Sequence, residues 1–246
     1  MPTEPPTVDW ERVKRCLAAL HRQAHPFLSR ALLIGGAACW FYHNALRHAA
    51  DPDFKAPALA PDLEAKWLSK DLDFTGIFSG DAMELMPQLV VREPGGRAHL
   101  AVEGVRLGFA QVGLTIDPEE ARLCCRVGRF TAADGATVEF FVADPVTLYR
   151  EKLALTQRRN SPADPLHLAL LAEYLRYETC LYAERLCVAT TLAEAKTALN
   201  FLELVRNRAM EVLNDERVKR RIQAALATNA GKVNPPDEHF LRTLLP

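Results

Sequence analysis

A short apolar run that stops at two glycines is the feature that most narrows the folds open to this chain. Residues 31–34 are all apolar, and Gly35 and Gly36 follow directly. A brief apolar run closed by glycines indicates a buried strand that enters a tight turn. Residues 37–48 then read as a helix, so the sequence predicts a strand, a glycine turn and a helix in succession. Such a turn presents backbone N–H groups and the positive end of a helix dipole to an approaching phosphate.

A second predicted strand carries two aspartates on one face. Residues 71–75 alternate polar and apolar side chains, so Asp71 and Asp73 leave the same side of the strand. Two like charges about 4 Å apart repel by roughly 4 kcal/mol at an effective dielectric constant of about 20. A divalent cation is the natural partner, because Mg²⁺ takes carboxylate oxygens and keeps positions open for phosphate and water. The alternative is a pair of exposed aspartates on an edge strand.

The rest of the pattern predicts an α+β chain. An amphipathic helix begins near Trp10 and is expected to end at Pro26, and Asp144 before Pro145 predicts the N-terminal cap of another helix. Residues 49–61 are rich in Asp, Pro and Ala and are expected to form a surface insertion that is ordered only in part. Short β-rich runs are predicted at 99–102, 105–112, 123–127 and 138–142. We therefore expect an α/β domain over residues 1–143 and a helical domain over residues 144–246.

Composition excludes several classes of protein. The six cysteines include no CxxC pair, so neither a zinc ribbon nor a redox motif is indicated. The N-terminal residues do not read as a signal peptide, and no apolar run is long enough to span a membrane, so we expect a reduced, cytoplasmic protein without a membrane partner. Thirty Lys and Arg balance 31 Asp and Glu, so no global field would attract a polyanion. The basic run at 217–221 is more typical of a solvated helix face than of a nucleic-acid site.

Three stretches together resemble the polymerase β-type nucleotidyltransferase superfamily, and most closely its AbiEii-like branch. Two of them are LIGGAACW at 33–40 and LSKDLDF at 68–74. The third, YREKLALTQRRNSPADPLHL at 149–168, is similar to the part of that branch where Glu-Lys-Leu, a later Arg and a helix-opening Asp follow one another. The resemblance covers about residues 30–172. It implies a nucleotidyltransferase-like mixed sheet flanked by helices and followed by a C-terminal helical bundle.

The resemblance also implies roles for individual residues. Asp71 and Asp73 would be metal ligands, and Gly35, Gly36 and Ser69 would contact the triphosphate. Lys152 would be a catalytic contact to the nucleotide phosphates, Asp164 an active-site carboxylate, and Glu139 a third catalytic carboxylate and metal ligand. For Glu139, an ordinary solvent-facing strand residue is an equal alternative. A triphosphate also needs cations from outside the strand region, and Arg158 follows Lys152 on the same predicted helix.

The function implied is an enzyme that depends on Mg²⁺ or Mn²⁺ and moves a nucleoside monophosphate from an NTP to a hydroxyl acceptor. The resemblance further implies an RNA acceptor, such as the 3′ end of tRNA, and a toxin-like role in a toxin–antitoxin or phage-defence system with a cognate antitoxin protein. The alternative is a catalytically degenerate module that keeps the fold for binding or protein interaction. Trp67 and His167, where family members commonly have other residues, favour this alternative.

Overall fold

The chain divides into two compact units. The computed structural model describes residues 10–58, 71–110, 116, 118–158, 161 and 163–245. Unit 1 comprises Met1–Tyr42 and Ala58–His167, and unit 2 comprises His43–Pro57 and Leu168–Pro246. Every described residue of the expected site therefore belongs to unit 1. The helix that follows Asp144 is part of unit 1 as well.

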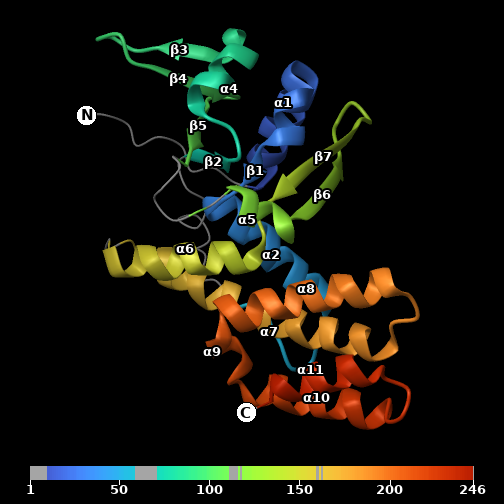
Figure 1. Cartoon of the computed structure of the whole chain (residues 1–246). Helices are drawn as coiled ribbons and strands as arrows, with labels where there is room; N and C mark the ends of the chain where they lie inside the picture. Colours follow the sequence, from blue (N-terminus) through green and yellow to red (C-terminus); the bar gives the residue numbers. More distant parts are fainter. Residues whose placement is uncertain are drawn as a thin grey trace. The chain divides into compact units, whose positions relative to one another are not determined.

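A mixed sheet of seven strands forms the centre of unit 1 (Figure 1). Its strand order is β3-β4-β5-β2-β1-β7-β6. The strands are β1 (Leu32–Leu33), β2 (Asp71–Thr75), β3 (Val90–Arg92), β4 (Ala98–Val102), β5 (Val105–Phe109), β6 (Arg126–Thr131) and β7 (Thr137–Val142). Strand β2 runs parallel to β5 and β1 runs parallel to β7, whereas β1 and β2 are antiparallel. The expected α+β class is thereby confirmed, including the mixed sheet and the helical C-terminal region.

The helices of unit 1 flank this sheet, and the first two of them pack against its apolar face. They are α1 (Trp10–Arg30), the first part of α2 (Gly35–Ala49), α4 (Ser79–Leu85), α5 (Pro118–Leu123), α6 (Pro145–Arg158) and the start of α7 (Ala163–Val188), with the 3₁₀ turn η1 at Pro87–Leu89. Phe27 of α1 packs edge-on against Phe74 of β2, with ring centroids 5.0 Å apart. Phe41 of α2 lies 6.1 Å from Phe140 of β7 in the same manner. The apolar positions of the alternating strands thus form the core.

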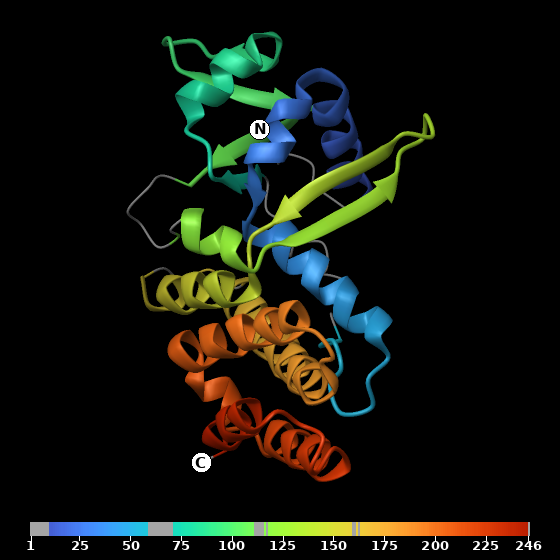
Figure 2. The same ribbon diagram turned by 45° about the vertical axis from the view of Figure 1, so that its right-hand side comes forward.

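The break expected near Pro26 is present: α1 consists of two helical segments that meet at Ala24, whose φ of −152° is not helical, and the second segment continues to Arg30. Proline lacks the N–H for one helical hydrogen bond, so the first segment ends just before it. The strand expected at residues 123–127 was misplaced, because α5 ends at Leu123 and β6 begins only at Arg126 and continues to Thr131. Figure 2 shows β6 and β7 as one long twisted hairpin.

Unit 2 is helical. It contains α7 from Leu168 onward, α8 (Leu192–Arg208), α9 (Met210–Leu213), α10 (Glu216–Thr228) and α11 (Pro235–Thr243). A capping box starts α8: the Glu194 N–H donates to Thr191 Oγ1, and the Thr191 N–H donates to Glu194 Oε2. The rings of Tyr182 and Phe201 stack in the core, 4.5 Å apart. None of the helices in the described ranges has the length and apolar character needed to cross a membrane.

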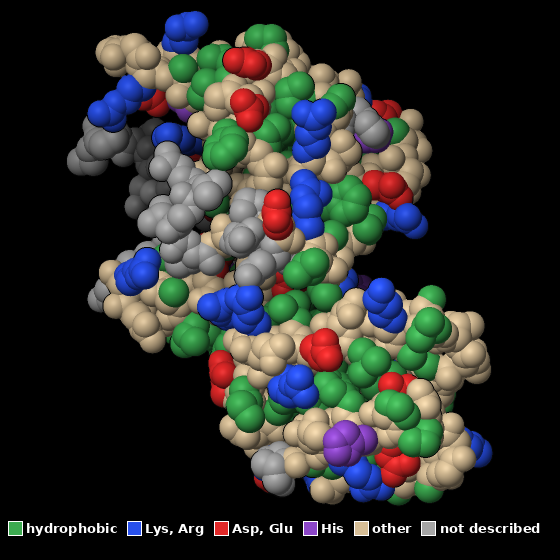
Figure 3. Space-filling model, in the orientation of Figure 1, with side chains coloured by type: hydrophobic (Ala, Val, Ile, Leu, Met, Phe, Trp, Pro, Cys, Tyr) green, Lys and Arg blue, Asp and Glu red, His purple; other side chains and the backbone are tan. Residues whose placement is uncertain are grey.

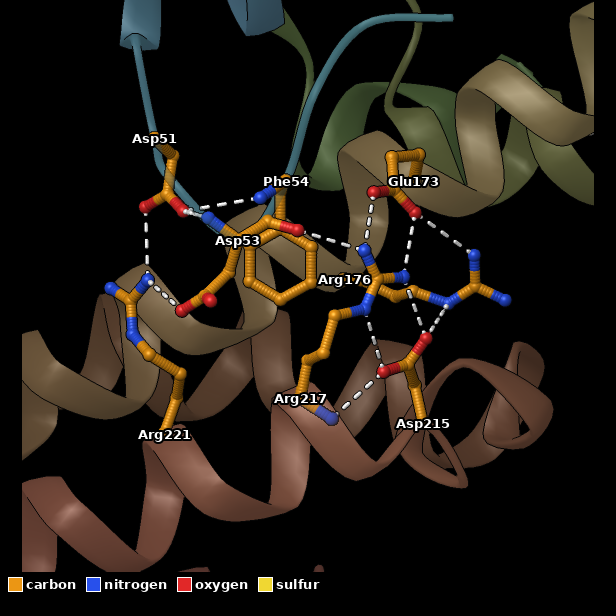
Figure 4. Close-up of polar contacts among 8 residues, drawn as sticks. All are labelled: Asp51, Asp53, Phe54, Glu173, Arg176, Asp215, Arg217 and Arg221. Carbon is orange, nitrogen blue, oxygen red and sulfur yellow. Dashed lines mark hydrogen bonds and ion pairs between the residues drawn. The ribbon is translucent and has the colours of Figure 1, made fainter.

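Residues 51–54 are anchored to unit 2 by arginines of α10 (Figure 4). Arg221 Nη1 donates to Asp51 Oδ2 at 2.9 Å, and Arg217 Nη1 donates to the Asp53 carbonyl at 2.8 Å. Phe54 is completely buried, with the Arg217 guanidinium 4.8 Å from its ring centroid. This part of the expected surface insertion is therefore packed into the unit. Long-range ion pairs of this kind leave no local sequence pattern. Residues 59–61 of the same expected insertion lie outside the described residues.

Candidate active site

Asp71 and Asp73 lie on the face of the sheet opposite the apolar core. Leu72 is 1% exposed on the core side, whereas both aspartates are half-buried. The parallel register pairs Asp71 with Arg106 and Asp73 with Gly108 of β5. Side chains that are paired across neighbouring strands leave the same face of a sheet. Strand β5 therefore places an arginine beside the first aspartate and a glycine beside the second.

The Asp73 carboxylate occupies a slot between two glycines. Gly35 opens α2 with a φ of +66°, a left-handed conformation that favours glycine. A methyl group added to Gly35 would lie 2.7 Å from Asp73 Oδ2, and one added to Gly108 would lie closer still to Asp73 Oδ1. Carbon atoms do not approach oxygen so closely without displacement. The carboxylate thus lies where only bare backbone leaves room for it.

A cavity of about 730 Å³ opens over these residues. Of the residues expected in the site, the following line it: Gly35, Asp71, Asp73, Lys152 and Arg158. They come from β2, from the turn into α2 and from α6, and all belong to unit 1. A volume of this size is in the range of small-molecule sites. The fold therefore gathers into one pocket groups that lie more than 100 residues apart along the chain.

Lys152 is held by a buried ion pair. Its Nζ lies 3.3 Å from Asp164 Oδ1 at the start of α7, and the two side chains are 4% and 1% exposed. The helix that carries it, α6, starts at the predicted cap, where the Thr147 N–H donates to Asp144 Oδ1 at 2.9 Å. Burial raises the pKa of the nearby Cys39 thiol to about 12, although the Lys152 ammonium opposes this shift. Lys152 and Asp164 are therefore buried together as an ion pair, and Lys152 also lines the pocket.

Glu139 is not brought to the aspartate pair. The strand pairings place Leu33 beside both Phe74 and Val142. Because β2 runs antiparallel to β1 and β7 runs parallel to it, Asp73 is level with Ala143, the residue that follows β7. Glu139 lies four residues before that level, about 13 Å down the strand. Its exposed carboxylate forms an ion pair with Arg129 on β6 instead. The solvent-facing alternative describes its position, and β7 gives the pocket no third carboxylate.

The remaining expected residues are placed as follows. Gly36 is buried at the second position of α2 and is not among the residues that line the pocket. Ser69 lies outside the described residues.

Within the described ranges, no group of three or more His, Cys, Asp or Glu side chains is arranged to hold a metal ion. The pocket is lined by the carboxylates of Asp71, Asp73 and Glu151, which are not arranged as a complete cage.

Among the lining residues that sequence reasoning missed are His99 of β4, and Arg106 and Gly108 of β5. Their strands were predicted, but the neighbour of β5 in the sheet was not. A period-two pattern indicates which residues share a face, and it does not identify the adjacent strand. Arg106 is exposed and makes no ion pair with any described residue, so its charge is available to the pocket.

The pocket is locally mixed in charge, and so is the surface. Asp71, Asp73 and Glu151 line the same cavity as Arg106, Lys152 and Arg158. On the face drawn in Figure 3, lysine and arginine side chains are interspersed with aspartate and glutamate, and neither sign forms a continuous field. This agrees with the formal net charge of −1. An anion would therefore be attracted by individual cations of the pocket rather than by the whole surface.

Comparison of the chain with models of protein families, with characterised proteins and with solved structures gives no significant match.

Proposed function

We propose that this pocket binds a nucleoside triphosphate and that the chain transfers a nucleoside monophosphate from it to a hydroxyl acceptor. The observation that carries the proposal is the position of Asp71 and Asp73 on one strand face, in a pocket that the Gly35 turn also lines. The resemblance to the AbiEii-like branch of nucleotidyltransferases supports the same conclusion. On this proposal, the mixed sheet of unit 1 is a nucleotidyltransferase-type sheet.

The residues of the pocket fit a divalent cation. Magnesium is commonly bound through one or two carboxylates, with substrate phosphates and water completing its octahedral shell. Asp71 and Asp73 supply two carboxylates on the pocket face, and the slot between Gly35 and Gly108 holds one of them in place. Mg²⁺, or Mn²⁺ on the same ligands, would be held there. Bound there, the ion supplies positive charge that stabilises the phosphoryl oxygens during transfer.

The chain's own residues would bind and orient the nucleotide. Gly35 exposes its backbone at the start of α2, where the first N–H groups of the helix and its dipole favour an anion. Arg106 and Arg158 line the pocket, and neither forms an ion pair within the described part of the chain. Lys152 also lines it, but a phosphate would have to compete with Asp164 for its ammonium group. We therefore assign the main phosphate contacts to the two arginines and a secondary one to Lys152.

The acceptor and the biological role follow from the resemblance. We propose an RNA hydroxyl, such as the 3′ end of a tRNA, as the acceptor. We further propose that the chain acts as the toxin-like member of a toxin–antitoxin or phage-defence system and that a cognate antitoxin protein restrains it. The pocket accommodates the nucleotide, and the acceptor hydroxyl must reach its open side.

A second candidate function is a nucleotide-binding or protein-interaction module without catalysis. Two observations favour it: β7 contributes no third carboxylate, and Asp71 has Arg106 as its cross-strand neighbour. An arginine beside a carboxylate can neutralise the charge that a metal ion would otherwise need to balance. This candidate predicts nucleotide binding that needs neither transfer nor a divalent cation.

Incubation of the protein with each α-labelled NTP, Mg²⁺ and total RNA tests the two candidates together. Label in the RNA that disappears with Asp73→Asn supports the transferase and identifies its base preference. Binding of an NTP without transfer, equal with and without Mg²⁺, supports the module. Failure of every NTP to bind would contradict the proposed pocket itself.

A further inference from the structure

We propose that Gly108 is a positioning residue for Asp73 and that Asp73 is the fixed carboxylate of the pair. The inference rests on the proposed function for its effect on binding, whereas its geometric basis is independent of that function. Nothing in the sequence pattern singles out Gly108, which lies on β5, 35 residues after Asp73.

The first step is that Gly108 is needed for space and not for backbone conformation. It is not among the glycines with positive φ, so any residue could adopt its extended backbone. The three atoms nearest to a methyl group added at Gly108 all belong to Asp73. An added side chain would therefore act on Asp73 directly and on no other side chain first.

The second step is that Asp73 could not move away on the other side. Gly35, in the turn into α2, closes that side, and a methyl group there would lie 2.7 Å from Asp73 Oδ2. The Ile34 N–H donates to the Asp73 carbonyl at 2.9 Å, which fixes the backbone beneath the carboxylate. Bare backbone therefore confines the carboxylate on both sides.

The third step is that the two aspartates are not equivalent. Asp71 is paired with Arg106, a long side chain that can adjust its position, whereas Asp73 is paired with Gly108. Glutamate is longer than aspartate by one methylene group. It should be tolerated better at position 71, beside Arg106, than at position 73, in the slot between the two glycines. Asp73→Glu should thus lose more divalent-dependent nucleotide binding than Asp71→Glu.

The experiment measures Mg²⁺-dependent NTP binding by calorimetry for wild type, Gly108→Ala and a control, Gly80→Ala. Misplacing a ligand through a neighbouring group typically costs about 10- to 100-fold in metal affinity, and we expect a loss of this size for Gly108→Ala. Gly80 in α4 has nothing within 4 Å of an added methyl group and has no positive φ. Gly80→Ala should change affinity by no more than about twofold, as surface substitutions do.

A double-mutant cycle that combines Gly108→Ala with Asp73→Ala separates an effect on the position of Asp73 from a general effect on stability. In the wild-type background Gly108→Ala should lower the denaturation midpoint, whereas in the Asp73→Ala background the midpoint should not fall, because the slot is then empty. An equal fall in both backgrounds would overturn the inference, as would wild-type NTP affinity in Gly108→Ala. If wild type binds no NTP, the proposed function fails, and the denaturation cycle alone then decides whether Gly108 positions Asp73.

Discussion

Lys152 and Asp164 form an ion pair in the interior of unit 1. Their Nζ and Oδ1 atoms are 3.3 Å apart, and neither side chain is more than 4% exposed. The pair joins the middle of α6 to the first turn of α7, and Lys152 lines the pocket. A buried charge that loses its partner is strongly unfavourable, so this contact supports the local fold whether or not a phosphate binds.

Removal of one partner of this pair should destabilise the protein by about 3–5 kcal/mol, because the other charge stays buried without compensation. We expect Lys152→Met and Asp164→Asn each to lower the free energy of unfolding in urea by this amount. The double variant should lose less than the sum of the two. Strict additivity would show that the charges do not interact in solution. Arg150→Met, at an exposed position of the same helix, is the matched control and should change little.

Arg106→Ala should weaken NTP binding by roughly 1.5–3 kcal/mol, the usual loss for a hydrogen bond to a charged group. Arg106 lines the pocket beside Asp71 and has no ion-pair partner among the described residues, so its loss should leave stability nearly unchanged. Calorimetric titration with each NTP measures the effect. Arg92→Ala on β3, an exposed arginine outside the pocket lining, is the control. Equal affinities for the two variants would remove Arg106 from the site.

Asp71→Asn and Asp73→Asn should abolish label transfer to RNA without lowering the melting temperature measured in the absence of divalent cations. The two carboxylates share a strand face, and neutralising one relieves their mutual repulsion. Asp81→Asn in α4, an exposed aspartate outside the pocket lining, should retain transfer. A large fall in melting temperature for either pocket variant would instead indicate a structural role for that aspartate.

The stability of unit 2 should depend on pH through Asp215. The hydrogen bond from the Arg217 side chain lowers the pKa of this carboxyl from 3.8 to about 2. The folded protein therefore binds this proton less readily than the unfolded chain does. The stabilisation is present above pH of about 4 and is lost as the pH falls toward about 2.

Asp215→Asn keeps a residue suited to the N-cap of α10 but removes the charge, so its stability should fall less steeply over this acid range. Acid unfolding followed by circular dichroism measures how steeply stability falls with pH for the variant and for wild type. Glu216→Gln, whose exposed carboxylate pairs with Lys219, serves as the comparison and should keep the steep fall. Identical slopes for Asp215→Asn and wild type would contradict the assignment.

The sequence by itself determined the local elements of the site, because short-range patterns govern them. The apolar run and the two glycines predicted β1 and the turn into α2, and the alternation of residues 71–75 predicted β2 with both aspartates on one face. Asp144 before Pro145 likewise predicted the start of α6. Strand period, turn glycines and helix caps each act within a few residues, so they can be recognised without knowledge of the fold.

Only the tertiary structure decided which of these elements meet. Residues 105–109 pair with β2, which brings Arg106 and Gly108 to the aspartates, while the register of β7 leaves Glu139 four residues before the level of Asp73. The partner of Lys152 also emerged only from the packing of α6 against α7. Strand neighbours, register and buried ion pairs depend on contacts between distant segments. An alternating pattern allows many such pairings, and the packing of the whole core selects one.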